Sequence, residues 1–292
     1  MGLLDVFIKR RGGGEAEMSF LDHLEELRWH IVRALIAITA AGIVIFIKTT
    51  FIFDHVLLAP THSDFWTFRQ MCALGNAIHM SSLCMGDFSL TIQNIDMSGQ
   101  FMISLTNAFS LGLVVAFPYV LWEAWRFVKP ALHEDEQRQV SGVVIAGSLL
   151  FYIGNAFGYF FISPFTVYFL GSYQVSETIK NVVNLESYLG TVTGLCFACG
   201  LVFEFPLVMY FLAKIGLATH EFLNQYRKVA VVLILFIAAI ITPSPDWVSQ
   251  SLVAIPLYGL FEVGMVISKR VTNQRRRHAA EKEAEEMKES SS

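Results

Sequence analysis

Five carboxylates outside the apolar runs have the chemistry to bind a cationic ligand. They lie on two segments: Glu25 and Glu26 near the amino terminus, and Glu134, Asp135 and Glu136 in a later polar stretch. Carboxylates accept guanidinium in bidentate pairs, a geometry that selects Arg over Lys. Two acids from the two segments could each hold one Arg of a pair. The open alternative is that these acids only form a solvated face.

Two further carboxylates, Glu204 and Glu262, lie inside apolar runs. A charged side chain at the middle of a bilayer costs about 2.5–3.5 kcal/mol on insertion scales, so such residues usually face a partner or a wet cavity. Pro206 leaves a backbone carbonyl unpaired one turn earlier and predicts a kinked, polar patch around Glu204. The alternative is a protonated Glu that hydrogen-bonds within its own helix bundle. This alternative is favoured more for Glu262 than for Glu204.

The chain carries no signature of an enzyme. It lacks a Walker-type phosphate loop, a dinucleotide fingerprint, an H-E-x-x-H motif and a G-x-S-x-G elbow. None of the eight His lies in the middle of an apolar run, which removes the usual metal ligands of an intramembrane protease. We therefore expect no metal, cofactor or catalytic residue. Partners or the membrane potential must drive any work.

The composition predicts that membrane-spanning helices position these residues. Hydrophobic residues make up 54% of the 292 residues and charged residues 16%, against about 25% in soluble domains. A spanning helix needs roughly 20 apolar residues, and lipid leaves no alternative to helices here. Six runs are candidate spans: 34–47, 101–122, 139–170, 187–213, 229–242 and 251–268. We expect an all-α integral membrane protein whose fifth and sixth spans are short, since 229–242 is brief and the last run contains Pro256.

The basic residues predict the orientation. If the amino terminus is inside, only Lys48, Arg69 and Lys180 of the 21 basic residues lie on or near the outer side. The positive-inside rule therefore places both termini in the cytoplasm. The net charge of −4 says little by itself, because the acidic tail dominates it.

The spans divide the chain into three parts. Residues 1–17 contain paired arginines but no apolar core that follows at once, so we expect a flexible cytoplasmic arm and not a cleaved signal peptide. Residues 18–270 form the membrane domain, whose long outer loop, about 49–98, has short helices of its own. Residues 271–292 are charged and low in complexity, which predicts disorder or a frayed helix. Their triple Arg indicates a membrane anchor and not a nucleic-acid patch.

The four cysteines fall in two pairs. Cys72 and Cys84 lie in the outer loop, where a disulfide is plausible in an oxidising compartment but not required by the spacing. Cys196 and Cys199 form C-x-x-C inside an apolar run. Packing is the better interpretation there, because redox or metal chemistry needs solvent access and partners.

Several motifs together resemble the TatC family, the core integral subunit of the twin-arginine protein translocase. The chain reads HLEELR at 23–28 and FPYVLWEAWRFVKPALHEDEQR at 117–138. LLFYIGNAFGYF, FEFP and TPSPDWVSQSLVAIPLYGLFEVG follow in the family's order, so that the likeness covers roughly residues 19–270. The resemblance implies a glove-shaped bundle of six helices in the bacterial inner membrane.

The resemblance also implies a function and its residues. Members bind the paired arginines of signal peptides on folded cargo, and the acids that match are Glu26, followed by Arg28, and Glu136. Phe127 matches an aromatic that supports the loop or packs on the peptide. Glu134 and Asp135 depart from the usual form of this loop, so which of its three acids contacts Arg stays open.

Three further positions match family residues. Glu204 matches a polar residue of the fourth span that contacts single-span partner subunits of the TatA/TatB type. Asp246 matches an acid of the last outer turn, whose role the residues alone do not reveal, and Pro60 matches a structural proline. The partners implied are signal peptides, TatA/TatB-type subunits, further copies of the chain and the lipid bilayer, but no nucleic acid.

Two other classes of function compete with this one. A proton-coupled secondary transporter would use Glu204 as its proton carrier, but such folds bring several polar groups from repeated, broken helices to the midplane. This chain offers few such groups and no evident repeat. An intramembrane enzyme would need the catalytic residues that the sequence lacks.

Overall fold

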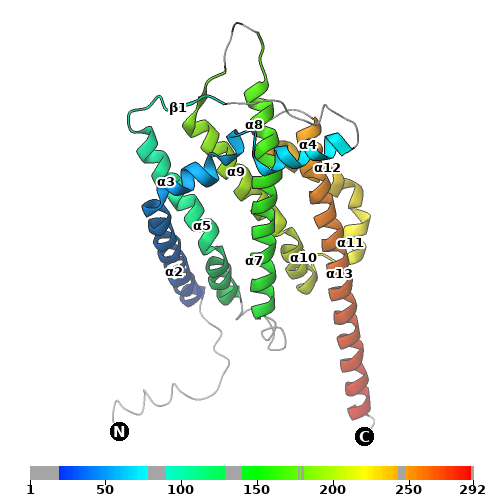
Figure 1. Ribbon diagram of the computed structural model, residues 1–292. Coiled ribbons are helices and arrows are strands. Elements are labelled where there is room, and N and C mark those ends of the chain that lie inside the picture. The colour runs from blue at the N-terminus through cyan, green and yellow to red at the C-terminus, as the bar shows by residue number, and fades with distance from the viewer. Residues whose placement is uncertain are drawn as a thin grey trace, which may run out of the picture.

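The computed structural model describes residues 20–77, 90–128, 140–176, 178, 181–242 and 247–290. Within them, five helical stretches are long and apolar enough to cross a membrane: Leu24–Ile47, Gly99–Val128, Gly142–Ser172, Leu185–Lys214 and Ser249–Gln274. The helices that begin these stretches are α2 (Phe20–Ile47), α5 (Gly99–Val128), α7 (Val140–Phe157), α9 (Leu185–Phe203) and α13 (Trp247–Ser290) (Figure 1). The predicted helical membrane architecture is confirmed.

Two of the long stretches change helix type or break part-way. α7 continues through a π-helical turn, η6 (Gly158–Ile162), into α8 (Ser163–Ser172). The fourth stretch breaks at Glu204, which ends α9 and precedes α10 (Phe205–Lys214). Pro206 lies in the first turn of α10, where its missing N–H is not needed. The kink that Pro206 predicts is therefore present.

The last two segments differ from each other in length. α12 (Arg227–Ile241) has 15 residues, or about 22 Å at helical rise, so it is short as expected. It is not among the five stretches long enough to cross a membrane, so the count of six spans stays a prediction. The prediction of a short sixth span is wrong, because the spanning part of α13 has 26 residues. Pro256 lies inside α13 without ending it, since neighbouring helices can satisfy the carbonyl that a proline frees.

α13 then continues to Ser290, so residues 271–290 are helical, as the second of the two alternatives for the charged tail expects and the first does not. Ala, Glu, Lys and Arg dominate this extension, and all four are strong helix formers. The extension projects beyond the other helices on the side where α2 begins (Figure 1).

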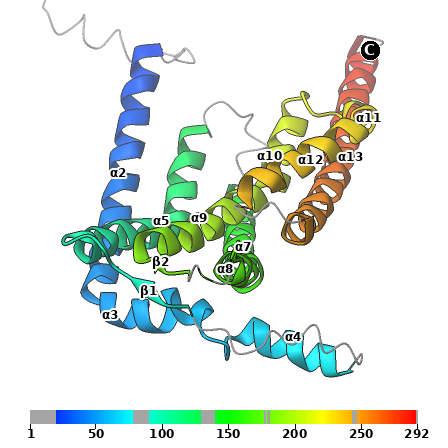
Figure 2. The ribbon, with the colours of Figure 1, turned by 90° about the horizontal axis from the view of Figure 1, so that it is seen from above.

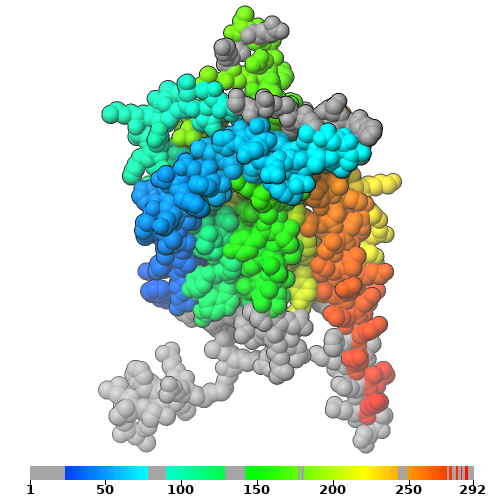
Figure 3. Space-filling view, in the orientation of Figure 1, coloured from blue at the N-terminus to red at the C-terminus, as the bar shows by residue number. Residues whose placement is uncertain are grey.

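A layer of short elements covers the opposite side, at the top of Figures 1 and 3. It contains the short helices expected in the long loop, namely α3 (Thr49–Ile52), η2 (Phe53–Leu57), η3 (Ala59–Thr61) and α4 (Trp66–Ala77). Two short strands, β1 (Ile92–Gln93) and β2 (Val183–Asn184), pair in parallel with Ile92 opposite Val183. This ladder joins the loop after α2 to the loop after α8.

Seen from above, α2 and α5 lie at one side, α10, α12 and α13 at the other, and α7 to α9 between them (Figure 2). One buried apolar cluster joins η6, α9, α12 and α13 through residues that include Ile162, Leu195, Ala238 and Leu257. Cys199 belongs to this cluster, and Cys196 and Cys199 are free thiols, as the packing interpretation expects. The arm at 1–17 lies outside the described residues.

Candidate functional site

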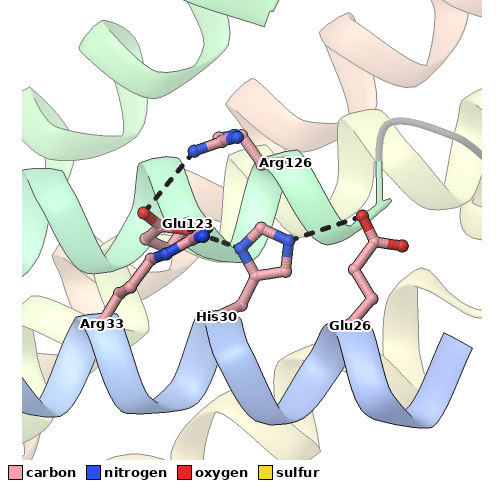
Figure 4. A network of polar contacts seen from close by, with 5 residues as sticks. All are labelled: Glu26, His30, Arg33, Glu123 and Arg126. Carbon is pink, nitrogen blue, oxygen red and sulfur yellow. Dashed lines mark hydrogen bonds and ion pairs between the residues drawn. The ribbon is translucent and has the colours of Figure 1, made fainter. Parts of the chain in front are cut away.

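The described residues bring two acids of α2 and α5 onto one histidine. His30 Nδ1 lies 2.5 Å from Glu123 Oε2, and His30 Nε2 lies 3.8 Å from Glu26 Oε1 (Figure 4). Glu26 and His30 share a face of α2 because they are four residues apart. An ionised carboxylate can only accept, so the proton between His30 and Glu123 is on Nδ1 when Glu123 is charged.

Two arginines complete the network around Glu123. Arg33 Nη1 lies 4.0 Å from Glu123 Oε2, and Arg126 Nη1 lies 3.8 Å from Glu123 Oε1. Glu123 is 1% exposed and His30 is 6% exposed, whereas both arginines reach solvent. The buried carboxylate is therefore surrounded by groups that compensate its charge, as buried ions require.

Each of the two acids nevertheless keeps one oxygen without a hydrogen-bond donor. Glu26 Oε2 and Glu123 Oε1 are buried and have no hydrogen-bond partner within the described part of the chain. Buried polar atoms are rarely left unpaired. The Glu26 side chain is 38% exposed, so this carboxylate can turn toward a ligand, and a guanidinium supplies several N–H donors in a fixed planar geometry.

A close crossing of α2 and α5 sets the distance between His30 and Glu123. A Cβ added at Gly112 would lie 2.8 Å from the Gly42 nitrogen and 2.8 Å from the Ile38 carbonyl oxygen. Small residues at such a crossing let two membrane helices approach backbone to backbone. The site therefore depends on glycines that lie well inside the apolar part of both helices.

Other predicted residues lie near this network or outside the described residues. The Phe127 ring meets the His30 ring edge-on with centroids 6.3 Å apart, so Phe127 supports the site. The Arg28 guanidinium lies 5.9 Å from the centre of the Trp29 ring, and Glu25 is exposed. Glu134, Asp135 and Glu136 fall outside the described residues. α5 extends to Val128, so residues 123–128, expected in a loop, are helical.

Glu204 forms the joint between α9 and α10 and is 8% exposed. Both of its carboxylate oxygens are buried without a hydrogen-bond partner in the described residues. Gly147 of α7 faces it closely, because a Cβ there would lie 3.1 Å from Glu204 Oε2. Glu204 is thus buried against α7, and both interpretations, a contact with a partner helix and packing within its own bundle, stay open.

Glu262 behaves differently from Glu204. It forms an ion pair with Arg227, whose guanidinium also donates to the Tyr258 hydroxyl at 2.8 Å. These contacts join α12 to α13 and give Glu262 a structural partner within the chain, which favours the internal alternative for this acid.

The remaining predicted residues lie in the loops. Pro60 is fully buried in η3, in keeping with a structural role. Cys72 is disulfide-bonded, but Cys84, its predicted partner, lies outside the described residues. Asp246 also lies outside them. Among the described residues no group of three or more His, Cys, Asp or Glu is arranged to hold a metal ion.

The sequence interpretation missed Glu123, His30, Arg33 and Arg126 as members of one site. Glu123 lies just beyond the end of the second apolar run, so it did not stand out as an acid inside the membrane. Arg126 three residues later was a usable signal, because residues at this spacing are neighbours on a helix. The contact with His30 depends on how α2 crosses α5, and no local pattern encodes it.

A family model described as Sec-independent protein translocase protein (TatC) matches residues 22–256. The chain belongs to the TatC family. It is 37% identical over 254 residues to the Sec-independent protein translocase protein TatC of Blattabacterium sp. subsp. Periplaneta americana, covering 86% of this chain and 95% of that protein. The TatC protein of Desulforapulum autotrophicum is 33% identical over 271 residues, covering 93% and 91%.

A solved structure agrees with these relatives. The chain resembles a crystal structure of the twin arginine translocase receptor TatC with a TM-score of 0.64 and 28% identity, over 86% of this chain and 99% of that one. As a member of the TatC family with several spanning helices, the protein is a membrane component of the Sec-independent translocase and not an enzyme. The predicted family and transport role are confirmed.

Proposed function

We propose that this chain is the subunit that binds twin-arginine signal peptides in the bacterial cytoplasmic membrane, with both termini in the cytoplasm. The observation that carries the proposal is the carboxylate of Glu26, whose Oε2 has no hydrogen-bond partner among the described residues and which shares His30 with the ion-paired Glu123. Glu26 and Glu123 lie near the ends of α2 and α5, on the side where the described chain begins and ends (Figure 1).

The docking chemistry follows from the acids. One guanidinium of the peptide is held by Glu26, with Glu123 behind it as a fixed negative charge. The second guanidinium is held by Glu136, on the segment that follows α5. Phe127 packs its ring edge-on against His30, and Arg28, an exposed residue of the same helix as Glu26, contacts the peptide beside it. A lysine pair binds less well, because it cannot make bidentate contacts with carboxylates.

Export of a twin-arginine reporter tests the docking. A hydrogen bond to a charged group contributes about 1.5–3 kcal/mol, so losing one acid should weaken peptide binding about 10- to 100-fold. We expect reduced export and reduced peptide cross-linking for the single variants Glu26→Ala, Glu136→Ala and Glu123→Gln. We expect the double variant, changed at both Glu26 and Glu136, to show no export and no cross-linking.

The matched control is Glu25→Ala, which removes an exposed acid next to Glu26 and should leave export intact. Membrane levels of each variant must equal those of the unaltered chain. Full export by the Glu26→Ala, Glu136→Ala double variant would sink the docking proposal. Equal losses in Glu25→Ala would show that total charge, and not position, matters.

We further propose that Glu204 is the contact for a single-span subunit of the TatA/TatB type. Its two oxygens lack donors within the described part of the chain, and a polar group on a partner helix would supply one. Partner subunits and further copies of this chain then assemble around the bound cargo, and the proton-motive force drives export.

Cross-linking tests the partner contact. We expect Glu204→Leu to weaken cross-linking to the partner helix, whereas Glu204→Gln, which can still hydrogen-bond, should retain most of it. Leu201→Ala, one turn earlier on an exposed position, is the control. Unchanged cross-linking in Glu204→Leu would favour internal packing of this acid, and transport of a small solute by vesicles containing the chain would favour the transporter alternative.

A further inference from the structure

A groove between α7, α10 and α13 lies apart from the carboxylates of α2 and α5. Its volume is about 540 Å³, and its walls are mostly apolar, with Val143, Leu150, Leu207, Val263 and Ile267 among the lining residues. In Figure 1, α10 lies between α7 and α13, and the residues that line the groove come from the start of α7, the start of α10 and the middle of α13.

The groove ends in polar side chains on the side where α2 begins. Tyr210, Arg270 and Gln274 line this end, and the Lys214 ammonium lies 5.3 Å from the centre of the Tyr210 ring. Val263, Ile267, Arg270 and Gln274 recur at helical spacing, so one face of α13 changes from apolar to cationic along the groove.

Arg270 differs from other arginines on the same side. Arg227 pairs with Glu262, and Arg276 pairs with Glu221 at 2.8 Å. Arg270 makes no ion pair or hydrogen bond to any described residue, and it is exposed at the end of the groove. A cation left unpaired beside an apolar groove is complementary to a ligand that is anionic at one end and apolar along the rest.

We propose that this groove binds an anionic phospholipid, with an acyl chain along the apolar walls and the phosphate on Arg270. Basic pockets between membrane helices on the cytoplasmic side bind anionic head groups in this way. An apolar protein helix fits less well, because it would fill the apolar walls and leave Arg270 without an anionic partner.

Gly142 offers a way to block the groove without disturbing the helices. A Cβ added at Gly142 meets nothing within 4 Å, so a larger side chain can enter the open space that the residue lines. Gly259 of α13 is equally open but does not line the groove, which makes Gly259→Leu the matched control for Gly142→Leu. Lys269→Gln is the matched control for Arg270→Gln.

Native mass spectrometry of the purified full chain in a non-ionic detergent tests the site, with phosphatidylglycerol or phosphatidylcholine added. We expect the unaltered chain to retain phosphatidylglycerol preferentially. Arg270→Gln should reduce that preference about fivefold, the weight of one basic residue beside an anionic lipid. Arg270→Lys should restore it, and Gly142→Leu should reduce retention of both lipids.

Three results would overturn the proposal. They are an unchanged preference in Arg270→Gln, an equal loss in Lys269→Gln, and an equal loss of lipid in Gly259→Leu. A photo-crosslinking residue at position 263 identifies the occupant directly. A link to lipid supports the proposal, and a link to another protein rejects it. None of these readouts depends on signal-peptide binding, so the site and the proposed receptor function fail or stand separately.

Discussion

The contact between His30 and Glu123 predicts a strong energetic coupling between α2 and α5. A hydrogen bond to a charged group contributes about 1.5–3 kcal/mol, and removing one partner of a buried pair costs about 3–5 kcal/mol. Arg33 and Arg126 stay near Glu123 at 4.0 Å and 3.8 Å, so part of the charge remains compensated. We therefore expect His30→Ala to lower the free energy of unfolding by about 3 kcal/mol.

A double-mutant cycle isolates the pair. His30→Ala, Glu123→Ala and the combined variant are unfolded in detergent, and the free energies of unfolding are compared. We expect the combined variant to be about 2 kcal/mol more stable than the sum of the single losses predicts, because after the first substitution the second no longer breaks the contact.

The control cycle uses Glu221 and Arg276, whose side chains also form an ion pair between two helices. Arg276 Nη2 lies 2.8 Å from Glu221 Oε1. Their side chains are 60% and 66% exposed, so solvent screens the attraction and the coupling should be far smaller. If the His30–Glu123 coupling is no larger than that of the exposed pair, then burial does not strengthen this contact, and the reasoning from burial is refuted.

Three further predictions concern other parts of the fold. Gly112→Val should destabilise the chain by about 1–3 kcal/mol in thermal unfolding, because its side chain meets backbone atoms of α2, whereas Gly194→Val, which faces open space, should have little effect. Arg227→Leu should loosen α12 from α13 more than Lys228→Leu does, as measured by cross-linking between the two helices, because only Arg227 pairs with Glu262. The pKa of Glu221 is held below its usual range by a backbone N–H and by Arg276, so its contact with α13 is present above the ordinary Glu pKa and is lost as pH falls through the lowered value. Spin labels at positions 224 and 277 should therefore report a constant distance at and above the ordinary Glu pKa and a longer one only at lower pH, and Glu221→Gln should abolish the transition.

Much of the helical layout was predictable from composition and hydrophobic runs alone. Runs of apolar residues near the length of a bilayer can only be helices in lipid, so the spans and the short α12 follow from the sequence. The break at Glu204 was also predictable, because Pro206 leaves a backbone carbonyl of the preceding turn without a partner. The length of α13 was not predictable. A proline such as Pro256 ends many helices in water, but it is tolerated where neighbouring helices satisfy the freed backbone groups.

The site was only half predictable. Glu26 and Phe127 could be assigned from motifs, because each belongs to a contiguous stretch of sequence. Glu123 could not, since its importance comes from the crossing of α2 and α5 at Gly42 and Gly112. That crossing places His30 and Glu123 in contact although they are far apart in the chain. Contacts of this kind depend on tertiary packing and leave no local pattern.

The parallel pairing of β1 with β2 constrains the order of events during biogenesis. β1 precedes α5, and β2 follows α8, so the ladder cannot close until the intervening helices have been threaded across the membrane. A chain in which α7 fails to cross would leave β2 on the wrong side and β1 with an unpaired edge. Closure of this small ladder therefore reports that the helices between β1 and β2 have been inserted in full.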